Sequence, residues 1–262
     1  MRRTPALFLI LSAALAAADK PALLAVFAHP DDETTVGPLL ARYAAEGHPV
    51  WLVSMTSGQK GVTPHGGIPA GDQLGKAREA ELRCSASALG IREPILLGYQ
   101  DQGISLPPEM EAIAGKLREI INRTKPDVIL TWGPDGLTGH PDHRAASSIA
   151  TQVFQQQALL EWKPKKLYYV AWPESRFARP VPPFIRPGAI RYTADRFLTT
   201  RVDGRRHLDT ARAAIQCHKT QWTPERMKEM DALNREGLGG NIYLRLALPP
   251  PGAARETGLL DP

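Results

Sequence analysis

Residues 22–33 read ALLAVFAHPDDE, an unbroken apolar run followed at once by a cluster of ionisable side chains. A short continuous apolar run is typical of a central strand in a parallel sheet, where helices bury both faces. The polar residues then fall at the carboxyl end of that strand, which is the edge where open α/β sheets bind ligands. This stretch therefore predicts both the class of fold and the position of a site.

Outward from this stretch, apolar runs alternate with helical patterns. Strands are predicted over residues 22–28, 50–55, 94–97, 127–132 and 167–171, and helices over 35–46, 73–89, 107–123 and 143–158. Repeated strand–helix units predict an α/β fold: a single Rossmann-like domain with a mostly parallel sheet and helices on both faces. Beyond about residue 163 the pattern loosens, and we expect a strand over 196–202, helices over 206–219 and from 224, and a strand over 242–248.

The two ends of the chain are set apart from this domain. A basic pair at positions 2 and 3, an uncharged apolar run and small residues up to Ala18 predict a cleaved signal peptide over residues 1–18. The apolar run is shorter than the about 20 residues that span a bilayer, so no stable membrane anchor is expected. We expect a secreted or periplasmic protein, with its domain over residues 19–248 and a flexible tail over residues 249–262.

The charge and the cysteine content limit the kinds of ligand and partner that the protein is expected to bind. The formal net charge is +5, and the basic residues are scattered rather than clustered, which argues against nucleic-acid binding. Cys84 and Cys217 are the only cysteines, too few for a disulfide scaffold and wrongly spaced for a cysteine zinc site. One bridge and two buried thiols are both compatible with the sequence.

Two polar clusters carry the chemistry. His29, Asp31, Asp32 and Glu33 follow the first strand, and packed carboxylates repel one another unless a cation neutralises them. The segment 133–143 follows the strand over 127–132 and ends in His-Pro-Asp-His. Adjacent strands of such a sheet would bring the two loops together. Two histidines, one carboxylate and an open position suit catalytic zinc.

With these motifs the chain resembles the LmbE-like or PIG-L-like zinc deacetylases, which remove acetyl groups from N-acetylglucosamine-type compounds. The resemblance rests on segments spread from residue 22 to residue 221. These are AHPDDE at 28–33, TSG at 56–58, REAE at 78–81, GYQD at 98–101, HPDH at 140–143 and HKTQ at 218–221. Thr220 stands where the family has a serine. AHPDDE followed by HPDH is the most specific part.

The resemblance implies a metal centre and a base. His29, Asp32 and His143 would bind one Zn²⁺ per chain, although other divalent metals are compatible with the same ligands. Asp31 would be the general base that takes a proton from water. Zinc would polarise the acetamide carbonyl and lower the pKa of the attacking water.

The resemblance also implies the remaining site residues. His140 would stabilise the oxyanion, and Asp142 would orient His140. Arg78 and Asp101 would contact the sugar. A small-molecule or glycan substrate follows, whereas the sugar itself, the acyl group, the native metal and the oligomeric state stay open.

The same residues are compatible with other functions. The rival enzymes are an amidase for a different amide and a non-haem Fe(II) oxygenase, although such oxygenases commonly adopt all-β barrels. A secreted carbohydrate-binding protein that keeps the metal without catalysis is the rival from another class. A dinucleotide site is disfavoured because HPDDE replaces a G-x-G-x-x-G turn. Glu33 and Glu81 are interpreted as structural rather than substrate-binding, and core packing is favoured for Trp132 and Trp172.

Overall fold

The computed structural model describes residues 20–177 and 190–248. The predicted signal peptide over residues 1–18 and the predicted tail over residues 249–262 lie outside the described residues. No helix within the described ranges is both long and apolar enough to cross a membrane.

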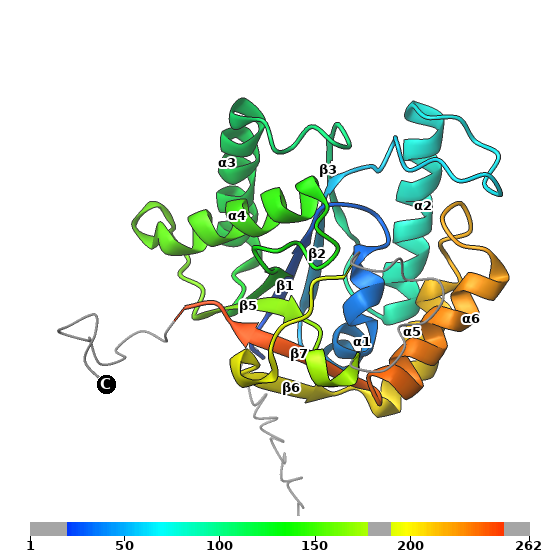
Figure 1. Ribbon diagram of the computed structural model, residues 1–262. Coiled ribbons are helices and arrows are strands. Elements are labelled where there is room, and N and C mark those ends of the chain that lie inside the picture. Colours follow the sequence, from blue (N-terminus) through cyan, green and yellow to red (C-terminus); the bar gives the residue numbers. More distant parts are fainter. Residues whose placement is uncertain (1–19, 178–189, 249–262) are drawn as a thin grey trace, which may run out of the picture.

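The centre of the molecule is a seven-stranded sheet in the order β3-β2-β1-β4-β5-β7-β6 (Figure 1). The strands are β1 (Leu23–Phe27), β2 (Val50–Thr56), β3 (Ile95–Tyr99), β4 (Val128–Trp132), β5 (Lys166–Ala171), β6 (Thr200–Asp203) and β7 (Asn241–Leu246). The first five strands are parallel, whereas β7 runs antiparallel to both β5 and β6. The predicted mostly parallel α/β sheet is confirmed.

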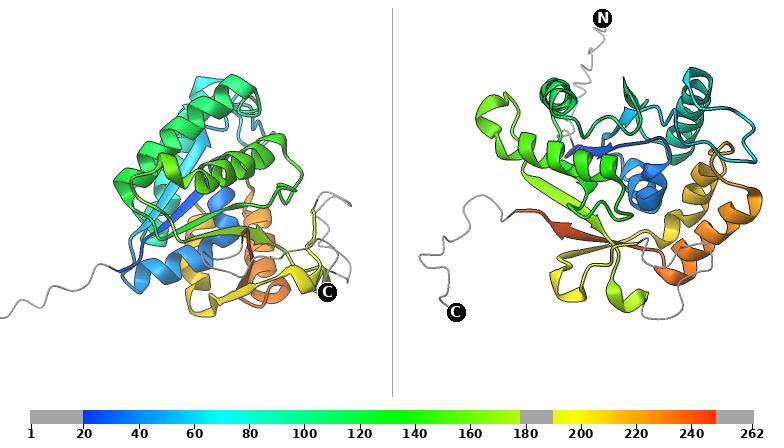
Figure 2. Two further views of the ribbon diagram at one scale, coloured as in Figure 1. Left: turned by 90° about the vertical axis from the view of Figure 1, so that its left-hand side faces the viewer. Right: turned by 45° about the horizontal axis from the view of Figure 1, so that its top comes forward.

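Helices cover both faces of this sheet. They are α1 (Gly37–Ala45), α2 (Asp72–Leu89), α3 (Pro107–Thr124), α4 (Pro141–Gln155), α5 (Leu208–Ile215) and α6 (Pro224–Ala232). Figures 1 and 2 show α3 and α4 on one side of the sheet and α1, α2 and α5 on the other. The helix α5, from the C-terminal part of the chain, packs against both α1 and α2. It therefore forms one layer with the helices of the first strand–helix units.

The strand β1 lies at the middle of the core. All five of its residues are buried, and it pairs in register with β2 through Leu23 and Val50, and with β4 through Leu23 and Val128. The chain builds β2 and β3 on one side of β1 and then crosses to place β4 on the other. The connections after β1 and β4 therefore diverge at the same sheet edge, which is where such sheets leave a crevice for ligands.

Three predicted elements differ from the structure. The helix expected over 35–46 is preceded by a 3-10 helix (Asp32–Val36), and α1 begins at Gly37 because Pro38 has no N–H and fits the first helical turn. The strand expected over 196–202 is confined to β6, after a 3-10 helix at Asp195–Phe197. The helix expected over 206–219 ends at Ile215, and a series of tight turns follows.

Cys84 and Cys217 form a disulfide with a Cα–Cα distance of 5.8 Å. Of the two alternatives that the sequence left open, the structure has the bridge. It joins the last turns of α2 to the residues that follow α5, across a sequence separation of 133 residues.

We expect Leu24→Ala to lower the free energy of unfolding by about 2–5 kcal/mol, because it opens a cavity at a fully buried position of β1. Chemical denaturation would measure the loss. Leu159→Ala is the matched control, because that leucine is 60% exposed and its change should stay within about 0.5 kcal/mol. Equal stability of the two variants would contradict the central place given to β1.

Candidate metal centre and active site

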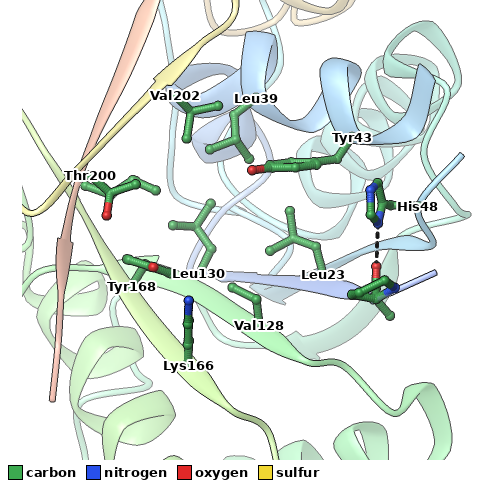
Figure 3. A pocket seen from close by; sticks show the side chains of 13 residues that line it. Leu23, Leu39, Tyr43, His48, Val128, Leu130, Lys166, Tyr168, Thr200 and Val202 are labelled. Carbon is green, nitrogen blue, oxygen red and sulfur yellow. Dashed lines mark hydrogen bonds between the residues drawn. The ribbon is translucent and has the colours of Figure 1, made fainter. Parts of the chain in front are cut away.

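Two of the cavities in the described part of the chain lie at opposite ends of the sheet and differ in their lining. The first lies between α1 and the amino ends of the strands and is lined largely by apolar side chains, including Leu39, Leu130 and Val202 (Figure 3). The second, of ≈ 290 Å³, opens where β1 and β4 end. It contains all three histidines predicted for the site together with Asp31 and Asp32, so it is the candidate active site.

The backbone around this cavity is unusual. Four described residues other than glycine have positive φ angles, and three of them, Asp31, Gln102 and Leu137, line the cavity. Such conformations persist only where the surroundings hold them, and they concentrate at functional sites. At Asp31, with φ of 108°, the N–H donates to Glu33 Oε2 over 3.0 Å, so the loop holds its own strained residue.

Asp32 is turned back into the protein. Its Oδ2 accepts the N–H groups of Ala28 and His29 at 3.0 Å each and the indole N–H of Trp132 at 3.2 Å. Its other oxygen, Oδ1, lies 3.2 Å from His143 Nε2. Burial raises the pKa of Asp32, but His143 and His29 outweigh this effect and hold it well below its usual range.

His143 is held in one tautomer. Its Nδ1 lies 3.0 Å from the carbonyl oxygen of Gly136, to which it can donate its proton, so that Nε2 is left as a free ligand atom. The ring of Trp132 stacks on His143 with centroids 4.6 Å apart. Trp132 is fully buried, so the predicted core role is confirmed, but it also orients both Asp32 and His143.

His29 stands among carboxylates. Its Nε2 lies 3.3 Å from Asp101 Oδ1 and 3.3 Å from Asp142 Oδ2, and its Nδ1 lies 3.8 Å from Asp32 Oδ2. Burial lowers the pKa of His29, but the hydrogen bonds to Asp101 and Asp142 outweigh it and raise the pKa to about 10. The carboxylates around His29 therefore favour positive charge at this position.

His140 begins α4 and caps it. The ring Nδ1 accepts the backbone N–H of Asp142 over 3.1 Å, so the remaining ring proton sits on Nε2. The carboxylate of Asp142 instead approaches His29 and accepts the N–H of Gln102 over 2.7 Å. Asp142 thus contacts His140 through its backbone. Burial, followed by the nearby His29 and His143, lowers the pKa of His140.

The donor atoms fit a divalent cation. Tetrahedral zinc with bonds of about 2.0–2.2 Å separates its ligand atoms by roughly 3.3–3.6 Å, close to the 3.2 Å between Asp32 Oδ1 and His143 Nε2. In the described part of the chain, two sets of three donor residues lie within 4.8 Å of one another: His29, His140 and His143, and His29, Asp101 and Asp142. The predicted ligands His29, Asp32 and His143 are neighbours in pairs, although these three do not form one of the two sets.

One buried oxygen also points to a missing positive partner. Asp142 is fully buried, and its Oδ1 has no hydrogen-bond partner. Buried polar atoms are seldom left unpaired, and a carboxylate oxygen is a good ligand for a hard or borderline cation.

Arg78 and Asp101, the residues that the resemblance placed on the sugar, line the cavity but are engaged with the protein. Arg78 donates to the carbonyl oxygens of Pro30 and Gly58 and, over 3.0 Å, to Asp31 Oδ2. Asp101 contacts His29 and accepts the N–H of Lys60. The structure therefore gives both residues a part in holding the site together.

Aromatic side chains form part of the wall that the sequence did not predict. Trp172 and Trp222 line the cavity beyond the histidines, together with Trp132. Trp172 is only partly buried and stacks on Phe177 with centroids 5.1 Å apart. Nothing in the spacing of these residues indicates a common site, because Trp132 ends β4, Trp172 follows β5 and Trp222 lies between α5 and α6.

Known proteins resemble this chain in sequence and in fold. The family profile described as "PIG-L: GlcNAc-PI de-N-acetylase" matches residues 24–154. A 1D-myo-inositol 2-acetamido-2-deoxy-alpha-D-glucopyranoside deacetylase of Thermobifida fusca is 35% identical, over 76% of this chain and 82% of the relative.

Two solved structures share the fold. The N,N'-diacetylchitobiose deacetylase of Pyrococcus horikoshii has a TM-score of 0.64 and 20% identity, over 86% of this chain and 82% of its own. The 4-carboxy-2-hydroxymuconate hydratase of Pseudomonas putida also has a TM-score of 0.64, with 18% identity over 92% of this chain and 100% of its own.

The fold, the cluster of histidines and carboxylates and the named relatives together define an enzyme of the deacetylase class. The chain belongs to the PIG-L family. The predicted resemblance is thereby confirmed.

We expect Gly58→Ala to destabilise the protein by about 1–3 kcal/mol, since Gly58 has a positive φ. An added Cβ would also lie 2.0 Å from Arg78 Nη1 and push that guanidinium away from Asp31. Gly115→Ala in α3 is the matched control, because its Cβ would meet open space and alanine favours helices. A Gly58→Ala protein as stable as the control in denaturant unfolding would show that the Arg78 contacts are dispensable.

Proposed function

We propose that this protein hydrolyses the N-acetyl group of an N-acetylglucosamine-type sugar or glycoconjugate, with zinc as the metal and Asp31 as the general base. The observation that carries the proposal is the meeting of His29, Asp32 and His143 with Asp31 at one cavity, at the β1–β4 edge of the sheet. The substrate class is supported by the relatives, whose names share a 2-acetamido sugar or a diacetylated chitobiose.

Asp31 is the carboxylate best placed to act as a base. Its side chain is 20% exposed to the cavity, whereas those of Asp32, Asp101 and Asp142 are 5% exposed or less. Burial raises the pKa of Asp31 to about 6, against the opposing effect of Arg78 and with a contribution from Asp32. A base with a pKa near neutrality transfers protons efficiently in both directions.

The residues around the cavity have separate roles in metal binding and proton transfer. His29, Asp32 and His143 would hold the metal, which when bound supplies Lewis-acid chemistry to the amide carbonyl and to water. Asp31 takes a proton from water as the water oxygen bonds to the carbonyl carbon. Asp31 then gives this proton to the nitrogen as the C–N bond breaks. The free amine and acetic acid leave, and the acid loses its remaining proton to solvent to become acetate.

His140 is the proposed donor to the developing negative charge on the carbonyl oxygen. Because its Nδ1 is used as the cap of α4, its proton is on Nε2 and the ring is fixed by the helix. A donor that is fixed before the reaction stabilises charge that appears only in the transition state.

We also propose that the protein works outside the cytoplasm, as the predicted signal over residues 1–18 suggests. The Cys84–Cys217 disulfide supports this proposal, because such bonds form and persist in oxidising compartments.

Acetate release from a panel of N-acetylated sugars tests the activity. We expect release from at least one sugar and a fall of roughly 10²–10⁴-fold in kcat for Asp31→Asn, which removes the base while keeping the shape of the side chain. Asp72→Asn, at an exposed position in the first turn of α2, is the matched control and should keep full activity. Full turnover by Asp31→Asn would refute the role of Asp31, and no release from any sugar would favour another amide or a binding protein.

Metal analysis tests the ligands. We expect about one zinc per chain, loss of acetate release after chelation, and its return on adding zinc. His143→Ala should lower the bound zinc well below one per chain, because it removes a ligand whose orientation is set by Gly136 and Trp132. A His143→Ala protein with its full complement of zinc would show that the metal is held by a different set of residues.

A further inference from the structure

A buried hydrogen-bond cluster lies behind Asp31, on the side away from the cavity, and the mechanism above does not use it. We propose that Glu33, Ser85 and His218 are positioning residues for Asp31, and that the Cys84–Cys217 disulfide holds two of them in place. This inference rests on the proposed function of Asp31 as the base. If Glu33, Ser85 and His218 position Asp31, the Cys84–Cys217 disulfide affects the rate of turnover as well as the stability of the protein.

Glu33 is the centre of this cluster. It is 1% exposed, and its Oε2 accepts the N–H of Asp31 over 3.0 Å. Its Oε1 accepts the hydroxyl of Ser85 and lies 2.7 Å from His218 Nε2. Both Ser85 and His218 are fully buried, so each contact is made in a medium where an unpaired polar group is strongly unfavourable.

The contact with Asp31 fixes a strained residue. A residue other than glycine with φ of 108° relaxes unless its surroundings hold it. Glu33 holds the backbone of Asp31, and Arg78 holds its carboxylate from the other end. The direction of the Asp31 side chain therefore depends on where Glu33 lies.

Helix α2 supplies the support. Arg78, Glu81 and Ser85 recur at spacings of three and four residues and so lie along one side of the helix. Arg78 contacts the Asp31 loop, Glu81 accepts the N–H and hydroxyl of Thr220 at 2.7 Å each, and Ser85 contacts Glu33. One side of α2 thus holds both the Asp31 loop and the turn that contains His218.

The disulfide closes this arrangement covalently. Cys84 directly precedes Ser85, and Cys217 directly precedes His218. The bond therefore limits how far apart the backbones that carry Ser85 and His218 can move. Burial lowers the pKa of His218, but the adjacent Glu33 outweighs it and the pKa is raised, which favours an ion pair between them.

Kinetics of acetate release would test the positioning role. We expect Glu33→Gln to lower kcat roughly 10- to 100-fold with KM and bound zinc unchanged, because an amide has one acceptor oxygen for three donors, and small displacements of a catalytic group have effects of this size. Ser85→Ala removes one donor and should lower kcat several-fold. Thr124→Ala is its matched control, since it removes a buried helical hydroxyl that bonds only Ile120 and should leave kcat unchanged.

Combination with Asp31→Asn separates positioning from a general effect on folding. If Glu33 acts through Asp31, the fold-reduction caused by Glu33→Gln should disappear when Asp31 is already Asn. Equal reductions in both backgrounds, or an unchanged kcat for Glu33→Gln, would overturn the inference and leave the proposed function standing. Full turnover by Asp31→Asn alone would overturn the proposed function and this inference with it.

The double variant Cys84→Ser/Cys217→Ser tests the disulfide. We expect kcat to fall about 10-fold with KM and bound zinc unchanged, because the turn that carries His218 gains freedom. A lower melting temperature with unchanged kcat would restrict the disulfide to stability and overturn its part in positioning. If this variant does not fold, kcat measured before and after reduction of the Cys84–Cys217 bond in the folded protein decides the same point.

Discussion

The structure depends on the neutralisation of buried carboxylates at the edge where β1 and β4 end. Asp32, Asp101 and Asp142 are nearly or fully buried there. Buried carboxylates that lie close together destabilise one another when they are all charged. His29 stands among them and its pKa is raised by their negative charge, while Arg78 faces Asp31. A divalent cation bound at this edge would supply the positive charge that these carboxylates favour. The strained backbone at Asp31 and Gln102 is tolerated because it brings these groups together.

Much of the fold could be predicted from the sequence, because β1 and β4 are apolar runs of the kind that is typical of a parallel sheet. The histidines and carboxylates that come directly after those two strands were expected at this edge from the same patterns, whereas Arg78 and Asp101 were placed there only by the resemblance. Elements whose shape is set by distant contacts could not be predicted. The helix after β6 ends at Ile215 because Cys217 and His218 turn toward α2 and Glu33, partners 133 and 185 residues away.

The site shows the same limit. Asp142 was expected to orient His140, and in the structure it contacts His140 through its backbone N–H while its carboxylate faces His29. A sequence motif identifies the residue, but it does not show whether the side chain or the backbone of that residue makes the contact. The hydratase of equal TM-score shows, likewise, that the fold alone does not decide the reaction. The side chains at the strand ends do.

The position of β7 has a consequence for how the molecule is made. The strand β6 pairs only with β7, and β7 lies between β6 and β5, so residues 241–246 complete the sheet. During synthesis from the ribosome, β5 keeps an open edge and β6 lacks its partner until residues 241–246 have emerged. Closure of the sheet therefore comes after all five parallel strands have been made, and the last pairing joins two strands to the sheet in one step.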